Sequence, residues 1–226
     1  MAHAGWGPSF EDDAYRTLMS LRSDDLQACH LRKIDDAEAL CQWVSRQLAC
    51  GQVVGWFQGP MEWGPRALGN RSILADPRRA EMTELINRKV KTREAFRPFA
   101  ASILEEALGD YFADAYPDAF MTQVYAVRPD KREIIPAVTH VDGSCRIQVV
   151  GPQAHPLYRQ LLESVAEHTG VPVLLNTSFN VQEPIVHKPS EALDCFLRTD
   201  IDILVLGHYA LMKTPRMSAH DRTDHA

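Results

Sequence analysis

Long hydrophobic runs are absent from this sequence of 226 residues. No stretch of about 18 apolar residues occurs, the length that a transmembrane helix needs, so no membrane-spanning helix is expected. Residues 1–8 lack a basic region followed by an apolar one, so a secretory signal peptide is not expected either. These two absences predict a cytoplasmic protein that does not act at a membrane.

Cysteines are few, odd in number and scattered. The chain holds five, and no two of them form a C-x-x-C pair. This argues against a disulfide framework and against a cysteine zinc site, and it favours reduced, mostly buried thiols. Serine nucleophile chemistry also lacks its usual sequence context, because no G-x-S-x-G elbow surrounds Ser178.

Positive charge is scarce overall but concentrated in one segment. The formal net charge is −6, which does not favour general binding to nucleic acid. Residues 64–97 nevertheless hold nine Arg and Lys against four Asp and Glu, a local balance of +5, while the rest of the chain carries −11. A basic segment in an acidic chain suggests a small anionic ligand better than a polyanion.

The local sequence patterns predict an α/β domain with a twisted, mixed sheet and flanking helices. Helical spacing of apolar residues and short β-branched runs locate the elements. Helices are expected at about 10–22, 36–50, 79–91, 157–168 and 189–198, and extended segments at about 53–57, 96–104, 120–127, 146–150, 171–175, 202–207 and 209–213. Residues 1–213 are expected to form one domain, and the polar tail 214–226 is expected to be disordered.

The segment "MEWGPRALGNRSILADPRR", residues 61–79, raises the question of phosphate binding. Gly64, four residues and Gly69 match the glycine spacing of a P-loop, but the lysine that should follow is missing. Two arginines, Arg66 and Arg71, stand in the segment instead. Two readings fit these residues: a phosphate site of another kind, in which glycines let the backbone approach an anion, or an ordinary turn with a basic surface.

Three further segments carry charged or polar groups, two of them next to predicted strands. They are "KVKTREAFRPF" with Lys89, Lys91, Arg93 and Arg97, "THVDGSCRIQ" with His140, Asp142 and Arg146, and "NTSFN" with Asn176, Ser178 and Asn180. Arginine forks match phosphate geometry, and lysine adds a movable point charge. The set therefore favours a site that holds several phosphates and works by positioning and charge neutralisation.

His140 and Asp142 leave several interpretations open. They could be a loop hydrogen-bond pair, or one of them could be a general base for an acceptor group. Their H-x-D spacing could also serve a metal ion, but no third ligand is evident, so no protein metal site is predicted.

The end of the third predicted helix decides whether Lys91 and Arg97 can reach one ligand. In a continuous helix their spacing would turn them by about 240° onto different faces. Pro98 disfavours helix at Arg97. We therefore expect Lys91 near the end of the helix and Arg97 outside it, free to turn back toward the same site.

Four motifs resemble a known family. "GQVVGWFQGPMEWGPRALGNRSILADPR", "KTREAFRPFAASILEE", "VTHVDGSCRIQVV" and "LLNTSFNVQEPIVHKPSEALDCF" look like the C-terminal domain of the nodulation and antibiotic O-carbamoyltransferases. The resemblance covers about residues 6–213. It implies the YrdC-like fold of the threonylcarbamoyl-adenylate synthases, with ATP, Mg²⁺ and carbamoyl phosphate as ligands, a carbamoyl-adenylate as product and pyrophosphate as leaving group.

Matched motif to motif, the family's ligand-binding positions fall on six residues, all of the family's residue type: Arg66, Lys91, Arg97, Arg146, Ser178 and Asn180. The four basic residues would hold phosphates and stabilise developing charge. The serine and the asparagine would orient the nucleotide or the carbamoyl group. The resemblance thus favours the phosphate-site reading of the glycine loop.

The family's N-terminal transferase domain and its metal-binding histidines have no counterpart in this sequence. Three explanations stay open: a partner protein supplies that domain, this domain transfers the carbamoyl group itself, or the chain is part of a longer protein. Two alternatives to an activating enzyme are a self-sufficient carbamoyltransferase or ligase acting on a hydroxyl or amine in secondary metabolism, and a non-catalytic nucleotide- or RNA-binding module. RNA binding is disfavoured because Trp56, Phe57, Phe96 and Phe99 lie in runs that look like core.

Overall fold

The computed structural model describes residues 3–214; most of the predicted tail therefore lies outside the described residues. Within this range the strands are β1 Cys29–Lys33, β2 Val54–Phe57, β3 Arg71–Ala75, β4 Ala100–Leu104, β5 Val124–Ala126, β6 Ser144–Val150, β7 Val173–Ser178, β8 Ile203–Leu206 and β9 Tyr209–Lys213. The α-helices are α1 Asp12–Leu21, α2 Ala37–Ala49, α3 Glu81–Lys89, α4 Leu108–Tyr111, α5 Pro156–Thr169 and α6 Pro189–Arg198.

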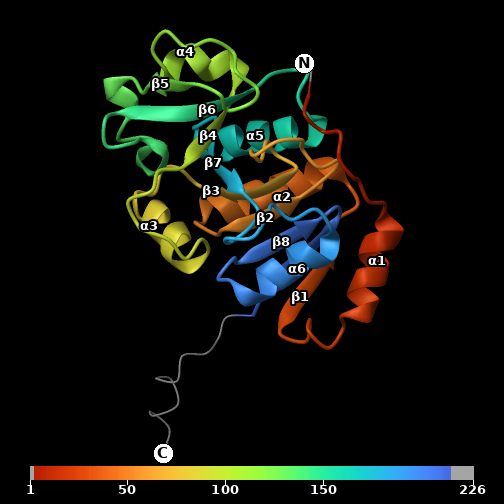
Figure 1. Cartoon of the computed structure of the whole chain (residues 1–226). Helices are drawn as coiled ribbons and strands as arrows, with labels where there is room; N and C mark the ends of the chain where they lie inside the picture. Colours follow the sequence, from red (N-terminus) through yellow and green to blue (C-terminus); the bar gives the residue numbers. More distant parts are fainter. Residues whose placement is uncertain (1–2, 215–226) are drawn as a thin grey trace, which may run out of the picture.

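The described strands form one sheet in the order β1-β9-β8-β2-β3-β7-β4-β6-β5, which runs across the whole molecule (Figure 1). The pairs β2–β8 and β4–β6 are parallel, and the other neighbours are antiparallel. The predicted mixed α/β sheet is therefore confirmed.

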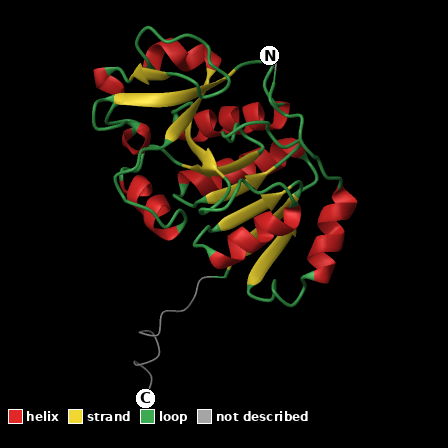
Figure 2. Ribbon diagram, viewed as in Figure 1, coloured by secondary structure: helices red, strands yellow, loops and turns green. Residues whose placement is uncertain are grey.

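Helices cover both faces of the sheet (Figure 2). On one face α2 and α5 pack against each other and enclose a core that includes Leu40, Trp56 and Leu174. On the other face α1, α3, α4 and α6 pack over a core that includes Phe57 and Ile73. Adjacent Trp56 and Phe57 thus point to opposite faces, as the alternation of a β-strand requires. No helix among the described residues is long and apolar enough to cross a membrane.

The segment after α3 brings basic residues back toward the sheet. The helix ends at Lys89, so Lys91 and Arg97 both lie outside it, and the prediction that the helix ends before Arg97 is confirmed. Thr92 has a φ of 48°, in the left-handed region, where the chain bends after the helix. Of the aromatic side chains assigned to the core, Phe99 is buried, but Phe96 is 79% exposed, so the core assignment of Phe96 is wrong.

Candidate anion-binding site

The glycine loop, residues 58–70, connects two antiparallel strands, β2 and β3. A P-loop connects a strand to a helix, so this loop is of another kind. Buried Glu62 shapes it by accepting hydrogen bonds from the backbone N–H groups of Leu68 and Asn70, both at 2.7 Å. Burial raises the pKa of Glu62, and the two N–H donors oppose that shift by stabilising its charged form.

Arg71, the second arginine of the segment 61–79, has a structural role and does not line the cavity described below. Its side chain is fully buried, and its guanidinium donates to the carbonyl oxygens of Gln58 at 2.6 Å and Pro8 at 3.1 Å. It also stacks on the ring of Phe57, with the guanidinium carbon 3.6 Å from the ring centroid. Burial lowers the pKa of Arg71 to about 10. Through these contacts Arg71 joins the glycine loop to the N-terminal segment.

A polar cavity of about 120 Å³ lies where β7 ends and β4 begins. Its described lining contains three guanidinium groups and no carboxylate, and it is formed by Pro65, Arg66, Ala67, Arg93, Pro98, Phe99, Ala100, Met121, Arg146, Asn176, Thr177 and Ser178. A cluster of cations without a counter-charge, next to hydroxyl groups, suits a phosphorylated ligand.

Arg66 and Arg146 face the cavity from different elements. Arg66 lies in the glycine loop and makes no hydrogen bond or ion pair with another described residue, while Arg146 is the third residue of β6. The Nε atom of Arg146 is buried, and no described group accepts a hydrogen bond from it. Burial and the nearby charge of Arg66 lower the pKa of Arg146. An anion in the cavity would oppose both effects by stabilising the charged form of Arg146.

Arg93 also lines the cavity, although it is not among the six ligand-binding positions that the family resemblance implied. Its Nε donates to Oδ1 of Asn87 at 2.6 Å, and its guanidinium lies over the ring of Phe99, 4.9 Å from the centroid. Asn87 is fully buried and also donates to the carbonyl oxygens of Ala95 and Arg97. The sequence named Arg93 among the basic residues of KVKTREAFRPF, but it could not separate this arginine from its neighbours.

Lys91, Ser178 and Asn180 form a second cluster beside the cavity. Nζ of Lys91 donates to the carbonyl oxygens of Ser178 at 2.6 Å and Asn180 at 2.8 Å, and to Oδ1 of Asn180 at 2.8 Å. The hydroxyl of Ser178 donates to the same Oδ1 at 2.7 Å. Burial, with a smaller effect from Arg93, lowers the pKa of Lys91 to about 7. Lys91 therefore holds the turn after β7, and Ser178 is the member of this cluster that lines the cavity.

The structure places Arg97, His140 and Asp142 outside the described lining of the cavity. Nε of Arg97 pairs with Glu94 at 2.9 Å on the surface, so an anion contact would require this ion pair to open. His140 contacts the carbonyl oxygen of Phe99 through Nε2 at 3.2 Å.

Asp142 acts within its own loop. It accepts hydrogen bonds from the backbone N–H and the hydroxyl of Ser144, and these bonds lower its pKa. No hydrogen bond joins Asp142 to His140 among the described residues; the hydroxyl of Ser144 contacts both, at 2.6 Å from Oδ1 of Asp142 and 3.3 Å from Nδ1 of His140, so the direct pair that the sequence left open does not form.

The described residues offer no protein site for a metal ion, since no three His, Cys, Asp or Glu side chains are grouped to hold one. The cavity lining likewise supplies no carboxylate ligand for Mg²⁺. The donor set fits phosphate oxygens, and a magnesium ion here would have to be held mainly by the phosphates themselves.

A more apolar groove of about 510 Å³ continues from the cavity. The two share Pro65, Arg66, Met121 and Arg146. The indole of Trp63, 74% exposed, borders this groove. An exposed aromatic surface beside an anion site is what a nucleoside phosphate needs, because the base can stack while the phosphates meet the arginines.

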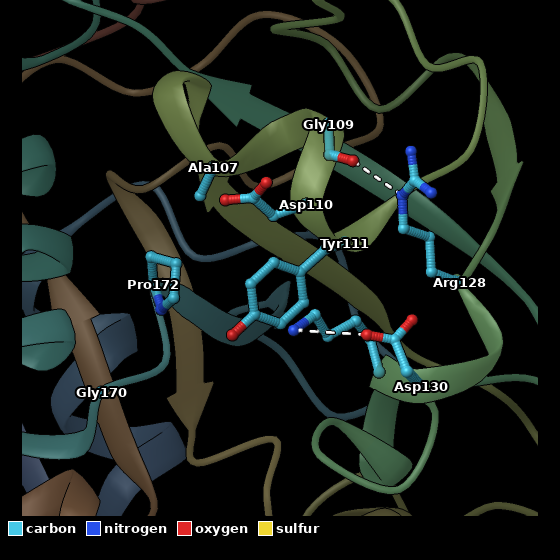
Figure 3. A pocket seen from close by; sticks show the side chains of 9 residues that line it. Ala107, Gly109, Asp110, Tyr111, Arg128, Asp130, Gly170 and Pro172 are labelled. Atoms are coloured by element: carbon cyan, nitrogen blue, oxygen red, sulfur yellow. Dashed lines mark hydrogen bonds and ion pairs between the residues drawn. The ribbon is translucent and has the colours of Figure 1, made fainter.

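A larger, open hollow of about 700 Å³ lies at the other end of β7 (Figure 3). Its cations are already engaged: Nε of Arg128 donates to the carbonyl oxygen of Gly109 at 2.7 Å, and Lys131 pairs with Asp130 at 3.5 Å. Carboxylates from Asp110 and Asp130 line it as well. This balance of charge makes the hollow a poorer anion site than the cavity.

A comparison with protein-family models assigns the chain to a family. The sequence model described as "Carbamoyltransferase C-terminus" matches residues 45–213. The chain belongs to this carbamoyltransferase C-terminal family. The resemblance found in the four sequence motifs is therefore confirmed.

Two curated relatives of this carbamoyltransferase C-terminal chain show how far the likeness extends. It is 43% identical to the nodulation protein NolO of Bradyrhizobium diazoefficiens over 216 residues, which cover 93% of this chain and 38% of the relative. It is 41% identical to the 3'-hydroxymethylcephem-O-carbamoyltransferase of Amycolatopsis lactamdurans over 164 residues, which cover 72% of this chain and 31% of that enzyme. The chain thus spans well under half of each of these relatives.

The fold of this carbamoyltransferase C-terminal chain has a counterpart among solved structures. Escherichia coli YciO superposes with a TM-score of 0.51 at 15% sequence identity, covering 74% of this chain and 76% of that one. The likeness establishes the YrdC-like fold that the sequence motifs implied.

Proposed function

We propose that this chain activates the carbamoyl group of carbamoyl phosphate with ATP and forms a carbamoyl-adenylate. One observation carries the proposal: a small cavity lined by Arg66, Arg93 and Arg146, without a carboxylate, beside the hydroxyl of Ser178. Family membership supplies the carbamoyl chemistry, because the cephem relative is by name an O-carbamoyltransferase. The site supplies what phosphoryl chemistry needs, namely positioned positive charge.

The reaction would proceed in two balanced steps. Water first attacks the carbonyl carbon of carbamoyl phosphate, and the bond from that carbon to the bridging oxygen breaks, so that carbamate and inorganic phosphate form and one proton is released to solvent. A carbamate oxygen then attacks the α-phosphorus of ATP, a new P–O bond forms, and the bond to the β-phosphate oxygen breaks, so that pyrophosphate leaves. Arg66, Arg93 and Arg146 would neutralise the charge that gathers on the phosphate oxygens. Mg²⁺ bound to the nucleotide would add further neutralisation.

The two neighbouring spaces would divide the substrates between them. The cavity would hold the reacting phosphates and the carbamoyl group, and the adjoining groove would hold the nucleoside with its base against Trp63. Lys91 would keep Ser178 and Asn180 in position through its three short hydrogen bonds. Arg97 would join the phosphate contacts only after leaving Glu94.

Transfer to an acceptor hydroxyl or amine would take place elsewhere. The described residues bring no general base into the cavity lining, since His140 and Asp142 lie outside it. The curated relatives are much longer than this chain, so a further domain or a partner protein would supply the acceptor site.

Pyrophosphate release tests the proposal. The purified chain is incubated with Mg²⁺, ATP and carbamoyl phosphate, and with each substrate left out in turn. We expect release only when both substrates are present. A folded sample that releases no more pyrophosphate than a heat-denatured control contradicts the proposal.

A further inference from the structure

A buried side chain in the lining of the cavity carries a hydrogen-bond acceptor that no described group uses. Asn176, in β7, lines the cavity and is 1% exposed. Its Oδ1 is buried and has no hydrogen-bond partner among the described residues. Unpartnered buried acceptors are rare because each costs about 1–3 kcal/mol of desolvation, so this oxygen calls for a partner from outside the protein.

A hydrogen-bond network fixes which edge of the Asn176 amide stays free. Nδ2 of Asn176 donates to the carbonyl oxygen of Ala67 at 3.3 Å and to Oε1 of Gln148 at 3.1 Å. The Gln148 amide is itself oriented, since its Nε2 donates to the carbonyl oxygen of Leu68 at 2.7 Å. Both partners of Nδ2 can only accept, so the nitrogen has to face them and the oxygen is left without a partner.

Two hydroxyl groups lock the same arrangement. Tyr158 donates to the hydroxyl of Ser102 at 2.8 Å, and Ser102 donates onward to Oε1 of Gln148 at 2.7 Å. Ser102 therefore has only its lone pair left for Asn176, so Nδ2 of Asn176, 3.0 Å away, is again the donor and shares its two hydrogens among Ala67, Gln148 and Ser102. The four side chains of the network are buried, so the amide is held rigidly.

The free oxygen differs in chemistry from the rest of the cavity. Arg66, Arg93 and Arg146 are donors that suit phosphate oxygens. An amide oxygen is itself an acceptor, so it repels phosphate oxygens and requires an N–H or O–H group instead. Of the groups in carbamoyl phosphate and in carbamate, only the NH₂ is such a donor at neutral pH. We propose that Oδ1 of Asn176 accepts a hydrogen bond from the carbamoyl NH₂ and so selects carbamoyl over acyl phosphates.

This selection rests on the proposed function and makes it more specific. An acetyl phosphate has the same phosphate and carbonyl but a methyl group in place of NH₂, so it would leave Oδ1 unpaired. One lost buried hydrogen bond of this kind corresponds to about a ten- to hundredfold weaker binding. A site built around a hydrogen bond generally rejects an analogue that lacks it.

Calorimetry on the full chain tests the selection. Freshly dissolved carbamoyl phosphate, acetyl phosphate and inorganic phosphate are titrated into the wild type and into Asn176→Ala. We expect the wild type to prefer carbamoyl over acetyl phosphate about ten- to hundredfold, and Asn176→Ala to reduce this preference to a few-fold while binding inorganic phosphate as before. An Asn176→Ala protein that keeps the wild-type preference, or a wild type without one, overturns the inference.

A measurement without a variant covers the case in which Asn176→Ala does not fold. ¹⁵N-labelled carbamoyl phosphate bound to the wild type should show its NH₂ resonances shifted and protected from solvent exchange, and unchanged resonances overturn the inference.

The outcomes of these experiments and of the pyrophosphate assay also separate the two proposals. Selective binding without pyrophosphate release keeps the role of Asn176 and contradicts the adenylate chemistry, whereas release driven equally by acetyl phosphate contradicts the role of Asn176 alone.

Discussion

Lys91 and Ser178 join two parts of the chain that are 87 residues apart, with Nζ of Lys91 2.6 Å from the carbonyl oxygen of Ser178. Only 3% of Lys91 is exposed, and its three short hydrogen bonds all go to the turn at Ser178 and Asn180. The basic segment after α3 is thereby attached to the end of β7, where the cavity lies.

The buried amine of Lys91 should make stability depend on pH. The pKa of Lys91 is about 7 in the folded chain against 10.5 for an ordinary lysine, so between these values the unfolded chain binds more protons. The free energy of unfolding should therefore rise with pH across this window, by up to about 1.4 kcal/mol per pH unit from this group. Urea unfolding of the wild type and Lys91→Met at several pH values isolates the slope, and parallel pH profiles for the two proteins would contradict it.

Arg146→Ala should weaken binding far more than it changes stability. The variant loses one charge-assisted contact to phosphate, worth about 1.5–3 kcal/mol, or roughly ten- to hundredfold in affinity for ATP and carbamoyl phosphate. The melting temperature should change little or rise, because the repulsion between Arg66 and Arg146 is removed. Arg88→Ala is the control, since Arg88 lies on the exposed side of α3 and pairs with Glu84. Wild-type affinity by calorimetry in Arg146→Ala would remove Arg146 from the site.

Asn87→Ala should release Arg93 from the cavity. Asn87 accepts from Nε of Arg93 and donates to the carbonyl oxygens of Ala95 and Arg97, so its loss should cost about 1–3 kcal/mol in stability and also lower the affinity for pyrophosphate. Asn87→Asp, which keeps the acceptor for Arg93, should retain more of the affinity. If Asn87→Ala is destabilised but binds pyrophosphate like the wild type, Arg93 is not an anion ligand.

Trp63→Ala should separate base binding from phosphate binding. Stacking on an exposed aromatic ring contributes about 1–3 kcal/mol per base, so ATP should bind roughly ten- to hundredfold more weakly. Inorganic triphosphate, which has no base, should bind as it does to the wild type. Trp6→Ala is a suitable control, because Trp6 is also exposed but lies outside the described lining of the groove. Equal losses for ATP and triphosphate would place the base elsewhere.

The sequence predicted the well-patterned elements and missed two strands for identifiable reasons. α2, α5 and α6 lie within about two residues of their predicted limits, since each has a strong apolar stripe and a clear start or stop. β1, with the sequence CHLRK, was missed because it is an edge strand that pairs only with β9 and exposes most of its side chains. β3 was missed because it follows directly on a loop rich in glycine, whereas its own pattern is that of a strand buried on both faces.

The sequence predicted which types of residue form the site, but not which arginines line the cavity. Sequence could place Ser178 and the basic segment near one sheet edge, because strand ends collect ligands in folds of this type. It could not show that Arg71 stacks on Phe57 and binds Pro8, or that the left-handed turn at Thr92 directs Arg93 inward. These outcomes depend on contacts between distant segments, and no local pattern encodes them.

Exchange of labelled pyrophosphate into ATP tests the central claim most directly, because it needs no acceptor and no partner protein. If the chain forms a carbamoyl-adenylate reversibly, label should enter ATP when carbamoyl phosphate is present and should not when it is omitted, and Arg146→Ala should slow the exchange about ten- to hundredfold. ATP that stays unlabelled in the presence of folded protein, Mg²⁺ and carbamoyl phosphate, or label that enters equally without carbamoyl phosphate, would contradict the account.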